Sequence, residues 1–475
     1  MVGGTTQVKK SFLLSAAKEN ERCFFDAFSC VSGQTLTAIK FQSHKRRQKS
    51  ATENKLRRGR SAETPHSPWP CMVLSFASPK HMLLRRYIGQ RLHAYYAQSA
   101  DSVVGGLEPL NFSSLWGQWH WMRLYRRLYK ETHGQWLTPV ELFQPHFSQV
   151  IANYIISCSQ KYSNVDDNRG PVDIVELGGG RGTNARHVMD HLAATQPDLY
   201  ERATYRLVDD SPSLLQLQQK RLHETPHGSK FQFSRQDLLQ VAESTVDLLP
   251  PSDHLTIVVG LEVLDNLPHD KIRIRGKSLI DQAIVRKMGS SQNLLEEVFL
   301  PLDDALIKRV LELGPEWKRV QLRHAWIPTV ICGVLDHLYQ NRPNTHVVLA
   351  DFDWLPAPDS PTTTIAPPRR SRLAVGEPIV TDMDDVDQAC YLSGQISSTS
   401  TPQLTDILFP TDFNKLATVV RAASGGTVEP LVQKQSDFLQ TYGPEQIRAT
   451  KSWLTGFTPM LGDFGNCSVL TTTVT

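Results

Sequence analysis

The sequence has few cysteines and no long hydrophobic run. Its seven cysteines are an odd number, lie far apart along the chain and include no Cys-x-x-Cys pair. This spacing argues against a disulfide framework and against a zinc site, so we expect a reducing compartment and no structural metal. No segment approaches the roughly 18 consecutive apolar residues of a membrane-spanning helix, so we expect no membrane span.

Length and charge define the organisation of the chain. The 475 residues exceed the roughly 250 to 300 at which one hydrophobic core stops growing, which favours two domains or one domain with large additions. The overall net charge of +3 is uneven, because residues 1–70 contain thirteen Lys and Arg against five Asp and Glu. The remaining chain is net negative, so we expect no nucleic-acid binding by the folded body. Residues 1–70 also lack sustained periodicity, which predicts a disordered basic extension.

The segment 71–106 allows two interpretations. Residues 82–97 place three apolar side chains four positions apart, with three arginines around them, as in an amphipathic helix. Such a helix is typical of a mitochondrial presequence, if translation starts at Met72 or Met82. It is equally typical of the first helix of a fold.

The pattern from residue 107 to residue 475 predicts one α/β domain. Short apolar runs of strand character alternate with helical stretches, which is the pattern of a parallel sheet. The expected strands are, in chain order, Val172–Leu177, Thr204–Asp209, Phe231–Leu238, Leu255–Leu261 and His346–Asp351.

Two additions interrupt this alternation. Residues 281–314 and 326–339 have helical spacing, so we expect a helical insert at about 271–340. Six prolines between residues 355 and 378 predict a long surface loop.

A glycine-rich loop follows the first expected strand. The sequence Glu176-Leu-Gly-Gly-Gly-Arg-Gly-Thr spaces Gly178, Gly180 and Gly182 two residues apart, whereas a dinucleotide fingerprint reads Gly-x-Gly-x-x-Gly. Glycines at a strand-to-helix turn let the backbone approach a ligand closely. With an acid two residues before the first glycine, this spacing indicates S-adenosylmethionine as the cofactor. Glu176 is then expected to attract the ammonium of its methionine moiety, directly or through the loop.

Acidic residues end the following strands. Asp209 ends the second and is expected to accept hydrogen bonds from the cofactor's ribose, while Asp237 ends the third, where such folds contact adenine. Glu262 and Asp265 follow the fourth strand, and ligands of doubly wound sheets lie at these carboxyl ends. Two carboxylates there suit the methylation of a guanidinium, which they orient by hydrogen bonds. The alternative is structural, with Asp265 capping a short helix and Glu262 in a salt bridge.

Six stretches of the sequence together resemble the MidA-type family of mitochondrial S-adenosylmethionine-dependent protein arginine methyltransferases, which are complex I assembly factors. The stretches run in family order and begin at Gly134, Glu176, Val208, Glu262, Asp351 and Asp406. The resemblance implies a class I methyltransferase Rossmann-like sheet of seven strands with helical insertions. It also implies a mitochondrial matrix location and symmetric dimethylation of an arginine on a protein substrate, a complex I subunit.

The resemblance further implies site residues. It assigns the two acids after the fourth strand to catalysis and places Thr138 and Glu141 near the methionine end of the cofactor. Two positions depart from the family pattern: Gly179 stands where the family often has proline, and Leu261 where it often has asparagine. Because Leu261 removes a polar contact expected near the methyl group, a second hypothesis stays open, a non-catalytic assembly chaperone that retains the fold.

Overall fold

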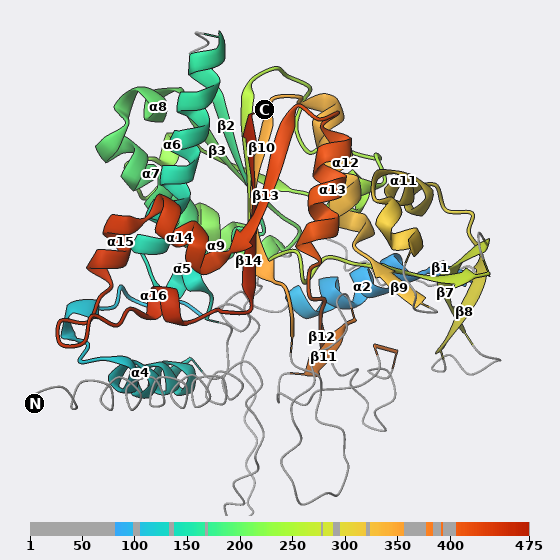
Figure 1. Cartoon of the computed structure of the whole chain (residues 1–475), viewed down its shortest axis with the longest axis horizontal. Coiled ribbons are helices and arrows are strands. Elements are labelled where there is room, and N and C mark those ends of the chain that lie inside the picture. The colour runs from blue at the N-terminus through green and yellow to red at the C-terminus, as the bar shows by residue number, and fades with distance from the viewer. Residues whose placement is uncertain are drawn as a thin grey trace, which may run out of the picture.

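The computed structural model describes most of the chain after residue 80 (Figure 1). The predicted disordered extension at residues 1–70 and most of the expected proline-rich loop at 355–378 lie outside the described residues. No helix in the described part is long and apolar enough to cross a membrane. The described residues are 81–97, 105–132, 137–166, 170–276, 279–287, 295–319, 324–355, 377–382, 391–392 and 405–474.

A seven-stranded sheet forms the centre of the molecule. Its strands are β2 (Val172–Leu177), β3 (Ala203–Asp209), β4 (Phe231–Arg235), β5 (Leu255–Leu261), β10 (Thr345–Phe352), β13 (Val428–Lys434) and β14 (Cys467–Val474). The order is β13-β14-β10-β5-β2-β3-β4, with β14 antiparallel to both neighbours and the strands from β10 to β4 parallel. The five strands expected from the sequence are confirmed, with small differences at their ends, and the sheet has the seven strands that the resemblance implies.

The central strands β2, β5 and β10 are buried on both faces, because they are apolar at successive positions. In β2, Ile174 packs into one core and its neighbour Val175 into the other, and Ile257 and Val258 of β5 divide in the same way. Helices cover each face (Figure 1). One face carries α4 (Gln118–Glu131), α5 (Pro139–Leu142), α6 (His146–Asp166), α7 (Thr183–Thr195), α8 (Pro197–Arg202), α9 (Pro212–His223), α14 (Gln435–Tyr442), α15 (Pro444–Ala449) and α16 (Pro459–Gly462). The other carries α10 (Leu238–Ala242), α11 (Ala305–Leu313), α12 (Thr329–Asn341) and α13 (Phe413–Ala423).

A second sheet corrects the expected helical insert. The stretch 281–314 consists largely of two paired strands, β7 (Leu279–Lys287) and β8 (Leu295–Pro301), followed by α11. Cross-strand pairs such as Ile284 with Val298 stabilise this pairing. The helical prediction was wrong because the spacing of short apolar runs does not separate a strand from a buried helix. The other strands of this sheet are β6 (Asp270–Arg275), β9 (His324–Ile327) and β1 (His81–Leu83).

Smaller elements complete the described structure. The expected helix at 326–339 is confirmed as α12, although β9 precedes it at Trp326. The remaining elements are the strand pair β11 (Ile379–Asp382) and β12 (Thr405–Leu408) and the 3₁₀ turns at Phe112–Ser114, Gly228–Lys230 and Pro315–Arg319.

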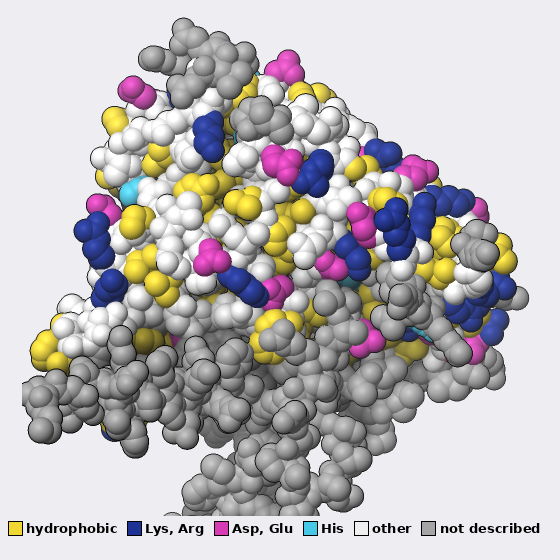
Figure 2. All heavy atoms as spheres, viewed as in Figure 1, with side chains coloured by type: hydrophobic (Ala, Val, Ile, Leu, Met, Phe, Trp, Pro, Cys, Tyr) yellow, Lys and Arg dark blue, Asp and Glu magenta, His cyan; other side chains and the backbone are white. Residues whose placement is uncertain are grey.

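Lys and Arg side chains gather at the end of the molecule that carries the second sheet (Figure 2).

The helix α2 (Leu84–Tyr96) is part of the fold. Leu84, Ile88 and Leu92 are buried, and they share a core cluster with Val285 of the second sheet. Of the two interpretations of residues 82–97, the structure therefore shows the first helix of the fold.

Candidate functional site

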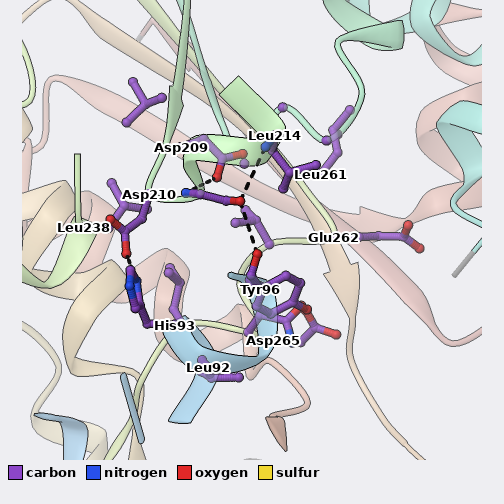
Figure 3. A pocket seen from close by; sticks show the side chains of 18 of the residues that line it. Leu92, His93, Tyr96, Asp209, Asp210, Leu214, Leu238, Leu261, Glu262 and Asp265 are labelled. Atoms are coloured by element: carbon purple, nitrogen blue, oxygen red, sulfur yellow. Dashed lines mark hydrogen bonds and ion pairs between the residues drawn. The ribbon is translucent and has the colours of Figure 1, made fainter. Parts of the chain in front are cut away.

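A cavity of about 960 Å³ lies at the carboxyl ends of β2, β3 and β5. Gly178, Asp209 and Glu262, which follow or end these three strands, all line it. The end of α2 closes one side through His93 and Tyr96 (Figure 3). The cavity thus lies where parallel doubly wound sheets bind their ligands.

The glycine loop forms one wall of the cavity. Gly178, Gly180 and Gly182 have φ angles of 65°, 51° and 78°, a region that favours glycine. A Cβ on Gly178 would lie 2.7 Å from Val263 Cγ2, so glycine is required where the loop meets the turn after β5. A Cβ on Gly179 would lie 2.8 Å from a Leu207 methyl group. The packing around residue 179 therefore suits glycine, at the position where the family often has proline.

Glu176 lies beneath the loop and is 3% exposed. Its Oε1 accepts a hydrogen bond from Asn184 Nδ2 at 3.0 Å, and its Oε2 accepts one from the Tyr205 hydroxyl at 2.9 Å. Burial raises the pKa of Glu176 to about 7, and these two donors act in the opposite direction. Because both oxygens are engaged with α7 and β3, the structure favours the indirect role, in which Glu176 supports the loop from below.

Asp209 ends β3 and is tied to the glycine loop. Its Oδ1 accepts a hydrogen bond from the backbone N–H of Ser211 at 2.9 Å, and its Oδ2 accepts one from Gln218 Nε2 at 3.4 Å. Gln218 is fully buried and also donates to the Gly180 carbonyl at 2.9 Å. Burial raises the pKa of Asp209 to about 6. Gln218 was not predicted, because nothing in a helix sequence marks a buried glutamine that supports a loop.

Asp237 combines a helix cap with a position in the cavity wall. Its Oδ1 accepts a hydrogen bond from the Leu239 backbone N–H at 2.8 Å at the start of α10, and burial raises its pKa. Leu238 and Leu239 line the cavity beside it. An acid next to an apolar surface suits a flat heterocycle with an amino group, which agrees with the adenine contact expected there.

The end of α2 meets the end of β3. His93 Nδ1 lies 2.6 Å from Asp210 Oδ2, and the Ser211 hydroxyl donates to the Tyr96 carbonyl at 3.1 Å (Figure 3). These contacts were not predicted, because α2 and β3 are more than a hundred residues apart in the sequence. They make α2 a wall of the cavity.

Thr138 and Glu141 lie at the start of α5 and line the cavity beside the glycine loop. The Thr138 hydroxyl caps the helix by accepting a hydrogen bond from the Glu141 backbone N–H at 3.3 Å. Glu141 is 3% exposed; burial raises its pKa, and Thr183 and Arg221 oppose this shift. The structure therefore brings both residues to the wall where the resemblance implies the methionine end.

Glu262 and Asp265 follow β5 in a turn with unusual backbone geometry. Glu262 has a φ of 51°, which is uncommon for a residue with a side chain and is typical of functional turns. Burial and then the charge of Asp351 raise the pKa of Glu262 well above its usual range. Among the described residues the Glu262 carboxylate has no hydrogen-bond or ion-pair partner, and Asp265 Oδ1 is buried without one. The alternative roles, a salt bridge and a helix cap, are therefore not seen.

Asp351, at the end of β10, holds this turn in place. Its Oδ2 accepts hydrogen bonds from the backbone N–H groups of Leu264 and Asp265 at 2.7 and 3.1 Å. Burial raises the pKa of Asp351 to about 7, and these backbone donors act in the opposite direction. Asp351 therefore positions the two predicted catalytic acids.

Asp406 lines the cavity together with Glu262 and Asp265. Its Oδ1 accepts a hydrogen bond from Asn266 Nδ2 at 3.0 Å, and its Oδ2 accepts one from the Tyr96 hydroxyl at 3.2 Å. Burial raises the pKa of Asp406 to about 7. Asp351 and Asp406 each begin a stretch that carries the family resemblance, so the sequence did contain a signal at both positions. No role was nevertheless predicted for either residue, because their spacing indicates none.

Comparisons with known proteins agree with this geometry. Residues 150–432 match the model of the family described as "Putative S-adenosyl-L-methionine-dependent methyltransferase". A crystal structure of a Burkholderia thailandensis protein bound to S-adenosyl-homocysteine is similar, with a TM-score of 0.54 and 15% identity over 83% of this chain and 88% of that one. A native crystal structure of an uncharacterized protein from the same organism gives a TM-score of 0.50 and 14% identity, over 83% of this chain and 87% of that one. A comparison with curated proteins finds no match.

Proposed function

Because the chain belongs to the family of S-adenosyl-L-methionine-dependent methyltransferases and takes its methyl group from this cofactor, we propose that the acceptor is an arginine guanidinium of a protein. The acid end of the cavity supports this proposal. A guanidinium is cationic and planar and presents several N–H donors, which match carboxylate acceptors.

The residues of the cavity fit the cofactor. The glycine loop, with Thr138 and Glu141 beside it, would hold the methionine end, Asp209 the ribose, and Asp237 with Leu238 the adenine. The cavity volume of about 960 Å³ lies at the upper end of the range for ligand pockets, about 300 to 1,000 Å³, and leaves room for an acceptor side chain. When bound, S-adenosylmethionine supplies an electrophilic methyl group on a positively charged sulfonium.

The observation that carries the proposal is that, among the described residues, neither the Glu262 carboxylate nor Asp265 Oδ1 has a hydrogen-bond or ion-pair partner. Carboxylates buried without a cation are costly, and a bound guanidinium would relieve this cost. Glu262 would orient one edge of the guanidinium, so that a nitrogen faces the methyl group. Its raised pKa also suits it to accept the proton that the guanidinium loses. Tyr125 and Tyr129 of α4 line the same cavity and would contact an acceptor bound there.

The biological setting follows from the family resemblance of the sequence. We propose that the acceptor is a complex I subunit in the mitochondrial matrix, that its arginine is symmetrically dimethylated, and that this supports complex I assembly. These statements rest on the six stretches that resemble the MidA-type family. The chaperone hypothesis is the second candidate, because Leu261 lines the cavity where the family often has a polar residue.

Methyl transfer is tested with the full chain, S-adenosylmethionine labelled in its methyl group, and purified complex I subunits. We expect label on an arginine, located by mass spectrometry, and none when that arginine is replaced by lysine. Cofactor binding without transfer to any subunit would overturn the arginine proposal and favour the chaperone. Label on lysine or on a small molecule would reassign the acceptor.

Asp209→Ala is expected to weaken binding of S-adenosylmethionine by about 1–2 kcal/mol, roughly 5- to 30-fold in Kd, because hydrogen bonds to a charged group are lost. Isothermal titration calorimetry measures the effect. The matched control is Asp198→Ala, since Asp198 is an exposed acid on α8 outside the cavity lining. An unchanged Kd for Asp209→Ala would refute the ribose assignment.

A further inference from the structure

The outer face of α4 is strongly basic. Its exposed residues project from one side of the helix, while Trp121, Tyr125 and Leu128 are buried on the opposite side, as the helical period of 3.6 residues dictates. The exposed residues comprise one aromatic, four basic and one acidic side chain: Trp119, Arg123, Arg126, Arg127, Lys130 and Glu131.

A second segment extends this face with apolar side chains. The loop between α15 and α16 carries Trp453 and Leu454, which are 67% and 61% exposed. The next residue, Thr455, packs against the segment that leads into α4, since a Cβ on Gly117 would lie 3.0 Å from Thr455 Oγ1. Figure 1 likewise shows the loop between α15 and α16 beside this segment.

Tryptophans dominate the exposed apolar surface of these two segments. Trp116 and Trp119 are 59% and 68% exposed, so four large apolar side chains of these segments are exposed, counting Trp453 and Leu454. In the described part of the chain, eight large hydrophobic side chains are exposed, and these four are half of them. We call the set the tryptophan-basic face, defined as Trp116, Trp119, Arg123, Arg126, Arg127, Lys130, Lys451, Trp453 and Leu454.

The charges of the tryptophan-basic face are largely uncompensated. Within the described residues, Arg126 and Lys130 have no ion-pair partner, and Arg127 meets only Glu131, at 3.5 Å with both side chains more than 60% exposed. Four bases of the second sheet differ, because Lys271, Arg273, Arg275 and Arg286 are each paired with an acid, as Arg273 is with Asp281 at 2.7 Å. A positive field therefore remains over α4.

We propose that the tryptophan-basic face docks on an anionic lipid bilayer. Tryptophan prefers the boundary between headgroups and acyl chains, and lysine and arginine bind the anionic phosphates above it. The charge complementarity selects an anionic surface. Three exposed indole rings on two neighbouring segments favour a bilayer over an acidic protein as the partner. An acidic protein would need only the exposed lysine and arginine side chains.

The proposal places the membrane beside the cavity. Tyr125 and Tyr129, on the opposite side of α4, line the cavity. One helix diameter, about 10 to 12 Å, therefore separates the bilayer from the cavity wall. Docking would bring the cavity to substrates held at a membrane surface.

Vesicle co-sedimentation of the full chain tests this docking. We expect the protein to bind phosphatidylcholine vesicles containing phosphatidylserine at least tenfold more tightly than vesicles of phosphatidylcholine alone, with binding that weakens as salt is added. The double variant Trp119→Ala/Trp453→Ala should lose at least tenfold in affinity. The control variant Leu431→Ala, which removes an exposed leucine from β13, should bind as the wild type does.

Other outcomes would overturn the proposal. Equal binding of the double variant and the wild type would assign lipid binding to the basic segment 1–70. Binding to polyglutamate but not to vesicles would make the face a site for acidic proteins. A thermal-melting measurement confirms that the double variant is folded. Methyl transfer to a soluble acceptor should be unchanged in this variant, so failure of the docking proposal and failure of the methylation proposal are distinguishable.

Discussion

Arg85→Ala should destabilise the protein by about 3–5 kcal/mol, the cost of removing one partner from a buried ion pair. Arg85 is 2% exposed, and its guanidinium donates to Asp270 at 2.9 Å, to Asp304 at 2.8 Å and to Glu243 at 3.1 Å. Asp270 is fully buried, and burial raises its pKa while Arg85 lowers it. Without the guanidinium these carboxylates would repel one another, and the ion pair between α2 and Asp270 of the second sheet would be lost.

Urea unfolding measures this change in the free energy of unfolding. Arg86→Ala is the matched control, because the Arg86 side chain is 55% exposed and pairs with the same Glu243, at 2.9 Å. We expect it to cost less than about 1 kcal/mol. If Arg85→Ala does not fold, the double variant Arg85→Met/Asp270→Asn should recover stability by removing the most buried unpaired charge. Equal effects of Arg85→Ala and Arg86→Ala would contradict the buried network.

Glu262→Gln should lower kcat for methyl transfer by about 10²- to 10³-fold, or about 3–4 kcal/mol, with little change in the affinity for S-adenosylmethionine. A neutral amide keeps the size of the side chain but neither attracts the guanidinium nor accepts its proton. Since burial raises the pKa of Glu262, the wild-type rate should fall as the pH is lowered and this carboxylate protonates. The variant should lose that part of the pH dependence.

Single-turnover rates and cofactor titrations separate the two effects. Glu429→Gln is the control, because Glu429 is an exposed acid of β13 paired with Arg421. A rate within about threefold of the wild type would remove Glu262 from the reaction. Loss of cofactor binding in Glu262→Gln would show that the residue holds the cofactor site together instead.

Local sequence signals predicted the cofactor half of the site. The glycine spacing after β2 and the acid at the end of β3 are both set by short-range rules, because a strand that ends in a tight turn needs glycine and a helix start favours an acid. Gly178 and Asp209 accordingly line one cavity. The sheet was predictable for the same reason, since continuous apolar runs identify strands that are buried on both faces.

The acceptor half of the site depends on long-range packing. Tyr96 reaches Asp406 across 310 residues, and Asp351 reaches Leu264 across 87. No periodicity relates such positions, so only the folded chain shows Glu262, Asp265 and Asp406 lining one cavity, with Asp351 bonded to the turn behind them. The second sheet was missed for a related reason: the pairing of β6 with β9 joins Asp270 to Ile327, and a distant partner decides that these residues form strands.

The position of β14 has a consequence for biosynthesis. This strand, Cys467–Val474, separates β10 from β13 in the sheet. A nascent chain that still lacks these residues leaves β10 and β13 with unpaired hydrogen-bonding edges, and such edges recruit other chains. A fragment that stops before Cys467 would therefore expose the edges of β10 and β13 that β14 pairs with in the folded sheet.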